Sequence, residues 1–473
     1  MRAAAIDSPN APAVIGAGGT LRYGELDLRV TRAAERIEDL GFKAGTRVAL
    51  HLPKDERYFV LLLALIRVGC VACPLSTRLP TRNVAPLMQK ISCRAMISSS
   101  EKILEAMDIG VQKQRPEKLL TPEPMAQNQN SEPLHLALDL PATIVFTSGS
   151  ADAPKAALHT FGNHYHSALG SNSNIALAPG DRWLHSLPLY HVGGLAILFR
   201  CLLAGAAIAL PEPETALGNA ITDSCATHVS LVSTQLRRLL REENFDLGKL
   251  RAILLGGGPM PASLIDEAVS RSLPIHTSYG LTEMASQVTA TPPGASRKEL
   301  HTSGRLLPYR EISISDDGEI LVKGKTLFSG YVTLDTVNRS LDADGWFRTG
   351  DLGELDADCY VHVRGRKDNL FISGGENVQP EEVEEALCRL EGVEEAVVVP
   401  VPDKEFGFRP VAFVRTVEGV AMSGDLARAL EQDLPRFKIP VSFYGWPKVG
   451  GGMKVDRAFF RERASRLVGE GQG

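Results

Sequence analysis

The segment from Ala142 to Lys155 combines residue types that bind phosphate groups. An apolar run, Ala-Thr-Ile-Val-Phe, is followed by Thr147-Ser148-Gly149-Ser150-Ala151-Asp152-Ala153-Pro154-Lys155. Loop N–H groups, hydroxyls and a lysine together can cradle a polyphosphate. The spacing does not fit GxxxxGK[ST], which disfavours an ordinary P-loop nucleotidase. Taken alone, the segment is equally typical of a polar surface turn.

Two further segments carry groups suited to a nucleotide. Between residues 278 and 283 the ring of Tyr279 can stack on a flat base, the Thr282 hydroxyl can bind phosphate, and Glu283 can hold Mg²⁺. Farther along, Asp351 can accept hydrogen bonds from ribose hydroxyls. The structural alternatives are that Thr282 caps a strand-to-helix turn and that Asp351 occupies a tight turn.

The C-terminal part contains two basic segments. Residues 364–369 read Arg-Gly-Arg-Lys-Asp-Asn, which is typical of a hinge that also contacts phosphate. A triple-glycine segment, 450–452, precedes Lys454 and predicts a mobile loop. A lysine delivered to a reacting phosphate ester would act as a catalytic cation. Lys448 is a competing candidate, and a lone lysine is otherwise simply solvated.

The elements that must position these groups follow an α/β pattern. Tyr23–Asp39 has an apolar face at helical spacing, and the segments Arg47–Leu52, Phe59–Val68 and Val71–Leu75 alternate between strand and helix. This alternation predicts a largely parallel sheet. Pro116–Pro133 is rich in proline, glutamine and asparagine and predicts a solvated loop.

The texture changes after about residue 300, where short strands separated by Asp-Gly turns predict a small β-rich subdomain. A helix is expected to begin at Pro380 in a compact terminal unit. With 473 residues, two or three domains are expected. The expected fold is therefore a large α/β domain of several subdomains, 1–366, and a small mobile α+β domain, 367–473.

Composition excludes several classes of protein. The chain is 44% hydrophobic and 23% charged, with 51 Lys+Arg against 56 Asp+Glu and a net charge of −5. These values disfavour disorder and binding to nucleic acid or a membrane surface. The longest apolar run, Val192–Leu210, contains Arg200 and predicts a buried helix and strand, with a membrane span as the alternative. No signal-peptide core is recognised near Met1, so a cytoplasmic location is expected.

Seven cysteines in so long a chain do not indicate a disulfide framework. Cys70 and Cys73 have CxxC spacing, but they lie in an apolar segment and no second pair accompanies them. We therefore expect both thiols to be buried structural groups rather than metal ligands.

In this order and spacing, the motifs resemble the adenylate-forming superfamily of acyl- and aryl-CoA synthetases, luciferases and adenylation domains. The resemblance extends from Leu21 to Lys454. Within the superfamily, residues 186–194, 254–258, 368–384 and 402–410 particularly resemble the 2-succinylbenzoate–CoA ligases of menaquinone biosynthesis. The resemblance implies an enzyme that uses ATP, Mg²⁺ and CoA. Its reaction would have two steps, in which an acid is first converted to an acyl-adenylate and then transferred to the CoA thiol.

The resemblance also implies roles for individual residues. Lys454, Thr282, Glu283 and Lys155 would be catalytic, with Glu283 on the metal and Asp368 at the hinge. The expected nucleotide-binding set consists of Thr147, Ser148, Gly149, Ser150, Gly256, Gly257, Gly258, Ser278, Tyr279, Gly280, Asp351 and Arg366.

The implied acid is an aromatic dicarboxylate, so the carboxylate that does not react needs a polar partner in an apolar pocket. Arg200 is the odd charge in its apolar run, and a buried charge is costly unless it is paired. We expect it to bind the ring carboxylate, directly or through water. Alternatively, it pairs with a structural acid or reaches solvent. Gly257 and His191 are also expected at the acyl pocket, although His191 is equally typical of a structural histidine.

One departure from the superfamily pattern affects the phosphate loop. Ala151-Asp152 replaces the usual Thr-Gly, so a hydroxyl is lost and a carboxylate is added. Two alternatives to the favoured function therefore stay open: a ligase for another aryl or acyl acid, and a non-catalytic nucleotide-binding paralogue. The expected partners are ATP, CoA and the acid, and the sequence leaves a monomer and a homo-oligomer both open.

Overall fold

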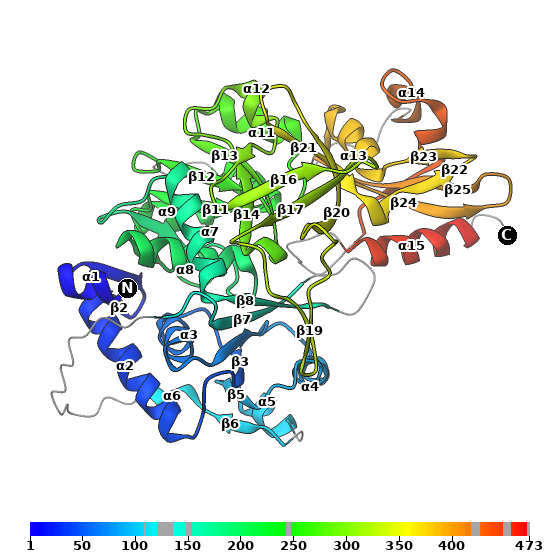
Figure 1. Ribbon diagram of the computed structural model, residues 1–473. Helices are drawn as coiled ribbons and strands as arrows, with labels where there is room; N and C mark the ends of the chain where they lie inside the picture. Colours follow the sequence, from blue (N-terminus) through cyan, green and yellow to red (C-terminus); the bar gives the residue numbers. More distant parts are fainter. Residues whose placement is uncertain are drawn as a thin grey trace.

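The computed structural model describes residues 1–107, 110–120, 136–147, 154–242, 247–417, 426–447 and 456–470. Four sheets organise these residues (Figure 1). In Figure 1 strands β7 and β8 cross the centre of the molecule, and the sheet formed after residue 370 lies at the upper right. The architecture is mixed α/β, as predicted.

The first sheet has nine strands in the order β15-β14-β13-β12-β11-β9-β10-β1-β2. Its central strands are parallel, and the segments between them include α8, the predicted buried helix. The strands are β1 Pro12–Gly16, β2 Gly19–Arg22, β9 Arg182–Leu184, β10 Ala207–Ala209, β11 His228–Leu231, β12 Ala252–Leu255, β13 Ile275–Leu281, β14 Ser286–Ala290 and β15 Arg305–Leu306. The helices that accompany it are α1 Arg2–Asp7, α7 Phe161–Asn174, α8 Val192–Ala204, α9 Leu217–Asp223, α10 Ser233–Arg241, α11 Ala262–Ser270, the 3₁₀ turn η1 Thr282–Met284 and α12 Arg297–Leu300.

The second sheet has eight strands in the order β19-β18-β8-β7-β4-β3-β5-β6. Strands β3 to β7 pair in parallel, as the alternation of strands and helices predicts. The strands are β3 Arg47–His51, β4 Val71–Pro74, β5 Ala95–Ser98, β6 Gln112–Gln114, β7 Pro141–Phe146, β8 Ala156–Thr160, β18 Gly330–Thr333 and β19 Thr336–Asn338. The helices are α2 Tyr23–Asp39, α3 Glu56–Val68, α4 Thr81–Lys90, α5 Glu101–Ala106 and α6 Pro116–Leu120.

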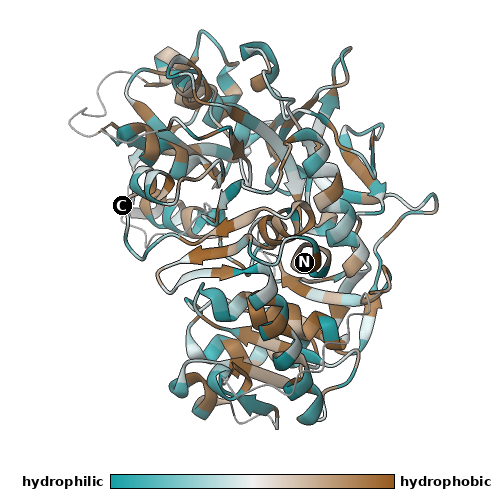
Figure 2. Ribbon diagram, turned by 90° about the vertical axis from the view of Figure 1, so that its left-hand side faces the viewer, coloured by the Kyte–Doolittle hydropathy of each residue, from teal (hydrophilic) through white to brown (hydrophobic). Residues whose placement is uncertain are grey.

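The largest hydrophobic core joins these two sheets. Buried residues of α2, α3 and α8 pack together in it, and the apolar face predicted for Tyr23–Asp39 is completely buried. Cys70 and Cys73 are buried, as predicted. In Figure 2 the hydrophobic segments gather in the interior and the hydrophilic ones outside. In the described part of the chain, no helix has the length and apolar character that a membrane crossing requires.

The two remaining sheets contain the later part of the chain. A four-stranded sheet has the order β16-β17-β20-β21, and a five-stranded sheet has the order β23-β22-β25-β24 with β26 beside β25. Their strands are β16 Arg310–Ile314, β17 Glu319–Gly324, β20 Phe347–Leu355, β21 Val361–Arg366, β22 Phe371–Ser373, β23 Glu376–Val378, β24 Val393–Asp403, β25 Gly407–Thr416 and β26 Ser442–Gly445. The helices are η2 Lys367–Asn369, α13 Pro380–Arg389, α14 Leu426–Leu430, η3 Arg436–Lys438 and α15 Arg457–Glu470.

One local prediction is wrong over its first five residues, since 121–133 of the predicted loop lie outside the described residues, and one structural alternative is also wrong. The segment predicted as a solvated loop from Pro116 begins with helix α6, because Leu119 is buried against α2 and α3 while Pro116 starts the helix. Asp351 lies inside strand β20 rather than in a tight turn. The register between β17 and β20 is irregular here, and Gly350 has φ +73°, so the strand bulges without ending.

Candidate active site between the sheets

The predicted phosphate loop connects two antiparallel strands, β7 and β8. Its base is closed by the N–H of Thr147, which donates to the carbonyl of Lys155 at 2.8 Å. The Lys155 ammonium lies 5.3 Å from the centre of the Tyr331 ring. Ser148, Gly149, Ser150 and the Ala151-Asp152 departure are outside the described residues.

The turn η1 places Thr282 and Glu283 beside this hairpin. The Nε2 of His159, on β8, lies 2.7 Å from the carbonyl oxygen of Thr282, and the Tyr331 hydroxyl donates to Glu283 Oε1 at 2.5 Å. Burial lowers the pKa of His159 to about 4, so its imidazole is neutral and Nε2–H is the donor. The structure therefore brings Lys155, Thr282 and Glu283 together.

Asp351, Tyr279 and Arg366 form a second cluster, which we call the nucleotide-side cluster. The Tyr279 hydroxyl donates to Asp351 Oδ2 at 2.7 Å, and Arg366 Nη1 donates to Oδ1 at 3.0 Å. Burial raises the pKa of Asp351, while the positive charge of Arg366 opposes that rise. A Cβ at Gly350 would lie 2.9 Å from Arg366 Nη2, so glycine leaves room for this guanidinium. Lone pairs left on Asp351 can still accept ribose hydroxyls.

The glycines predicted to line the pocket lie at the carboxyl ends of β12 and β13. The Ser278 hydroxyl donates to the Leu255 carbonyl at 2.7 Å, and a Cβ at Gly256 would lie only 2.8 Å from that hydroxyl oxygen. Gly257 has φ +86°, and a Cβ at Gly258 would meet open space. At Gly280 a Cβ would lie 2.3 Å from the Ser286 carbonyl oxygen, so the close approach of β14 requires glycine.

Arg200 is buried on α8, with 1% of its surface exposed. Its Nη2 donates to Gln287 Oε1 at 2.8 Å and to Ser286 Oγ at 3.2 Å, and its guanidinium lies 5.2 Å from the centre of the Trp183 ring. It therefore neither reaches solvent nor pairs with a carboxylate of the described residues, which removes both alternatives raised by its sequence context. Burial lowers its pKa to about 10, so the group stays charged at neutral pH.

The partners of Arg200 connect it to the nucleotide motif. In the pairing of β13 with β14, Gln287 lies opposite Gly280 and Ser286 opposite Leu281. The arginine is thus bound to the strand that faces the segment leading into Thr282. His191 precedes α8 and its ring lies 4.7 Å from that of Tyr190; it is partly buried.

The predicted hinge is exposed. The Asp368 side chain, in η2, is 64% exposed and lies 3.4 Å from Arg366 Nη2. Lys367 pairs with Asp317 and Glu319 of the four-stranded sheet. Lys454 and its competitor Lys448 are outside the described residues.

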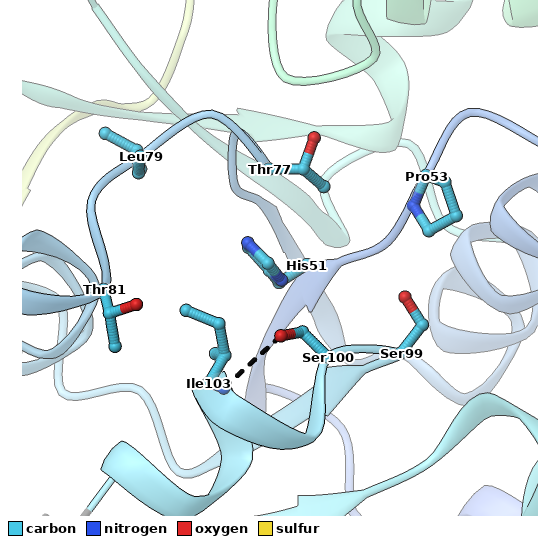
Figure 3. A pocket seen from close by; sticks show the side chains of 8 residues that line it. All are labelled: His51, Pro53, Thr77, Leu79, Thr81, Ser99, Ser100 and Ile103. Atoms are coloured by element: carbon cyan, nitrogen blue, oxygen red, sulfur yellow. Dashed lines mark hydrogen bonds between the residues drawn. The ribbon is translucent and has the colours of Figure 1, made fainter. Parts of the chain in front are cut away.

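A separate cavity of about 360 Å³ opens at the carboxyl ends of β3 and β5 (Figure 3). Among the described residues, its lining contains no Lys or Arg, so it lacks the cations that a polyphosphate needs. The lining consists of His51, Pro53, Thr77, Leu79, Thr81, Ser99, Ser100 and Ile103.

Several site residues were not expected from the sequence: Tyr331, His159 and Gln287. Two of them had a usable signal, because His159 and Gln287 are polar residues inside short strands that are otherwise largely buried. Nothing adjacent in the sequence relates Tyr331 to Glu283, from which it is separated by 48 residues.

The surroundings of Glu283 indicate which kind of metal site it could belong to. One oxygen accepts the Tyr331 hydroxyl, and within the described ranges no group of three or more His, Cys, Asp or Glu side chains could hold a metal. Mg²⁺ in nucleotide sites is commonly bound by one or two carboxylates, with phosphates and water completing the shell. A single oriented carboxylate such as Glu283 therefore suits Mg²⁺ bound together with a nucleotide. It does not suit a metal ion whose ligands all come from the protein.

Relatives match the chain along nearly its full length. A curated 2-succinylbenzoate–CoA ligase of Listeria monocytogenes is 31% identical over 467 residues, which cover 97% of each chain. A solved o-succinylbenzoate CoA synthetase of Bacillus subtilis, in complex with the acyl-adenylate intermediate OSB-AMP, has a TM-score of 0.86 and 31% identity, and covers 96% of each chain. The same enzyme with ATP and magnesium ion also has a TM-score of 0.86, at 32% identity, covering 96% and 97% of the two chains.

Two family models match separate parts of the sequence. The model described as AMP-binding enzyme matches residues 1–332, and the one described as AMP-binding enzyme C-terminal domain matches residues 382–448. The site geometry, the matched models and the relatives agree, and the chain belongs to the AMP-binding enzyme family.

Proposed function

We propose that the chain is a 2-succinylbenzoate–CoA ligase of menaquinone biosynthesis. It converts 2-succinylbenzoate, ATP and CoA to 2-succinylbenzoyl-CoA, AMP and pyrophosphate. The names of the relatives and the ligands bound in the solved structures support this activity. The observation that carries it is buried Arg200, which is bound beside the nucleotide motif without a carboxylate partner among the described residues.

In the first half-reaction the succinyl carboxylate attacks the α-phosphorus of ATP and pyrophosphate leaves. This brings two anions together, so converging cations and donors lower the barrier most. Thr282 contacts the α-phosphate, and Lys155 contacts the β- and γ-phosphates with Thr147, Ser148, Gly149 and Ser150. Lys454 bridges the carboxylate and the α-phosphate.

Other residues hold the nucleotide in place. Glu283 holds Mg²⁺, which neutralises charge on the phosphate oxygens when bound. Asp351 accepts the ribose hydroxyls, and Arg366 and Tyr279 fix its orientation. We assign Gly256, Gly257, Gly258, Ser278 and Gly280 to the lining of the nucleotide and acyl pocket, where Gly258 leaves open space.

In the second half-reaction the CoA thiolate attacks the carbonyl carbon of the acyl-adenylate, and AMP leaves. We assign residues 1–366 to a large domain and 367–473 to a small one that rotates about Asp368 between the steps. The exposure of the Asp368 side chain supports this hinge, because a rotation there would not pull that side chain out of a packed core.

Arg200 recognises the ring carboxylate that does not react. A buried guanidinium without a counter-ion is costly, and an arriving carboxylate compensates it. The Nε atom of Arg200 is buried and lacks a hydrogen-bond partner, so a donor remains for the carboxylate or for a bridging water. We also assign His191 and Gly257 to the acyl pocket.

The decisive experiment incubates purified protein with Mg·ATP and 2-succinylbenzoate, with and without CoA, and follows products by mass spectrometry. The acyl-adenylate is expected without CoA, and succinylbenzoyl-CoA with AMP in its presence. Product from another acid but not from this one would favour the other-acid alternative. Intact ATP binding with no product from any acid would favour the non-catalytic paralogue, which Ala151-Asp152 motivates.

We further propose a cytoplasmic enzyme that forms a homo-oligomer. The proposed co-substrates, ATP and CoA, support the cytoplasmic location, because both would have to be present where the enzyme acts. Fractionation of the source cells would test this location. Sedimentation velocity on the purified chain tests the assembly, and a monomer at micromolar concentration would contradict it.

A further inference from the structure

A second arginine, Arg310, is buried close to Arg200. It begins strand β16 and is 5% exposed. Its Nε donates to the Gln287 carbonyl at 2.6 Å and its Nη1 to the Pro308 carbonyl at 2.6 Å. Its Nη2 donates to the carbonyl and to the hydroxyl of Ser167, each at 3.2 Å. All these acceptors are neutral, so the positive charge is solvated by dipoles but not balanced.

Helix α7 leaves space for this guanidinium. Gly170 lies inside the helix, where a Cβ would be 2.2 Å from Arg310 Nη1 and 2.7 Å from the Pro308 carbonyl oxygen. Glycine inside a helix destabilises the helix relative to alanine. At position 170 the close packing of Arg310 requires glycine in spite of this loss of stability. The Arg310 guanidinium is thus a packed part of the interior and not a side chain that lies on the surface.

Gln287 connects the two arginines. Its backbone carbonyl accepts from Arg310, and its side-chain Oε1 accepts from Arg200 and from the Ser171 hydroxyl. Its Nε2 is buried without a hydrogen-bond partner, as is Nε of Arg200. We call Arg200, Gln287 and Arg310 the acid-side cluster. Two donors and two positive charges are therefore left without an acceptor anion among the described residues.

This imbalance is unusual for a buried cluster, because burying charge is unfavourable unless an opposite charge compensates it. Burial, together with the charge of Arg200, lowers the pKa of Arg310 to about 9. A carboxylate in the acyl pocket would compensate both guanidinium groups at once. An uncharged group at the same place would leave them unbalanced.

We propose that Arg310 is a specificity-determining residue, which with Arg200 and Gln287 makes the acyl pocket select acids that have a second carboxylate. Arg310 acts through its charge and through the Gln287 carbonyl that it holds, so it is a positioning residue. This inference rests on the proposed function and extends it from one arginine to a pair.

The test compares two acids in Arg310→Met. The acids are 2-succinylbenzoate and 3-benzoylpropionate, which has the same skeleton without the ring carboxylate. We expect kcat/KM for 2-succinylbenzoate to fall about 10-fold, mainly through KM, since a charge at second-neighbour distance is partly screened. For 3-benzoylpropionate the change should stay within about 2-fold. Arg310→Lys should keep most of the selectivity, because it keeps the charge.

Arg47→Met is the matched control. Arg47 also donates to a backbone carbonyl, that of Ile91 at 2.6 Å, but it lies in the second sheet. This variant should leave the ratio of kcat/KM between the two acids unchanged. Thermal unfolding of each variant reports whether it is folded. If Arg310→Met does not fold, Arg310→Gln is compared with Arg310→Lys in the same assay.

The outcomes distinguish a failure of the role given to Arg310 from a failure of the proposed ligase function. Equal losses for both acids in the Arg310 variants would show a merely structural role and overturn this inference alone. Folded Arg310→Lys could also lose as much selectivity as Arg310→Met or Arg310→Gln. That result would contradict the inference, because the positive charge would then not be the cause of the selectivity. An unmodified protein that makes no succinylbenzoyl-CoA would overturn the proposed function, and this inference with it.

Discussion

The nucleotide-side cluster and the acid-side cluster flank the same segment, Ser278 to Gln287, but balance their charge differently. In the nucleotide-side cluster the carboxylate of Asp351 is paired with Arg366 and accepts the Tyr279 hydroxyl. In the acid-side cluster two guanidinium groups are bonded only to neutral oxygens of the described residues.

This difference matches what each cluster has to bind. Ribose hydroxyls are neutral, so a carboxylate that receives them can be compensated in advance and kept in one orientation. A carboxylate ligand brings its own charge, so its pocket is balanced only when the ligand is present. A buried charge without a counter-ion in the protein thus indicates a ligand of opposite charge. A buried charge that is already paired indicates a group held in place to receive a neutral ligand.

The largest expected effect is that of Arg200→Leu. Removing the guanidinium leaves the ring carboxylate without its cation, and kcat/KM for 2-succinylbenzoate should fall about 100-fold or more, since truncating a buried charged partner costs about 2–5 kcal/mol. Turnover of 3-benzoylpropionate should change far less. Steady-state kinetics with both acids measures this, and an unchanged kcat/KM for 2-succinylbenzoate would refute the assignment of Arg200.

A smaller effect is expected for Asp351→Asn on the other side. The amide cannot accept the same charge-assisted bonds, so KM for ATP should rise about 30-fold, in line with about 1.5–3 kcal/mol for a hydrogen bond to a charged group. The ratio between the two acids should not move. Asp356→Asn, which alters a half-buried carboxylate paired with His362, serves as the control. A changed acid ratio in Asp351→Asn would break the separation of the clusters.

Acid should destabilise the protein through its buried histidines. The pKa of His159 falls from its ordinary value of 6.5 to about 4 in the folded chain, because of burial. Between these values the unfolded chain binds the extra proton, so stability is complete above pH 6.5 and is lost as pH falls toward 4. His159 alone should contribute about 1 kcal/mol per pH unit in this window.

Chemical denaturation at pH 7 and pH 5 would measure this loss. His159→Gln keeps a donor for the Thr282 carbonyl but cannot titrate, so its loss between the two pH values should be smaller. Equal pH dependence in both proteins would contradict a neutral buried His159. His185 and His228, with pKa values lowered by burial to about 3 and about 4, contribute to the remaining loss. Burial also lowers the pKa values of His51, His164 and His276, which add to it.

The smallest expected effect is that of Tyr331→Phe. It removes the hydroxyl that orients Glu283, so the affinity for Mn²⁺ in the presence of ATP should weaken about 3- to 5-fold, the usual net value of one hydrogen bond. Electron paramagnetic resonance of free Mn²⁺ gives this affinity without turnover. Tyr360→Phe removes a similar bond to Glu299 and should leave the affinity unchanged. An unaltered affinity in Tyr331→Phe would show that the hydroxyl does not position Glu283.

Much of the fold could be predicted because periodicity is a local property. The apolar spacing in Tyr23–Asp39 and the alternation around Arg47–Leu75 correspond closely to α2, β3, α3 and β4. Helix α6 was missed because its apolar residues, Leu119 and Leu120, are only a short pair within a polar segment. Its burial depends on α2 and α3, which its own sequence does not reveal.

The site could be predicted only in part. Arg200 stood out because a charge interrupts an apolar run, and its burial follows from that run. Arg310 begins an ordinary short strand, and its relation to Arg200 arises only when β14 and β16 meet across Gln287. Tertiary pairing of this kind leaves no spacing in the sequence. The assigned roles, those of Lys454 and the phosphate loop included, remain proposals for mutagenesis.

The most direct test of the charge argument uses the unmodified protein. The ratio of kcat/KM for 2-succinylbenzoate to that for 3-benzoylpropionate compares two acids that differ only in the ring carboxylate. An unbalanced pair of buried guanidinium groups predicts a ratio of about 100 or more, because binding a carboxylate that compensates buried charge is favoured by about 3 kcal/mol. A ratio near one would contradict the account, since the acid-side cluster would then not sense the carboxylate.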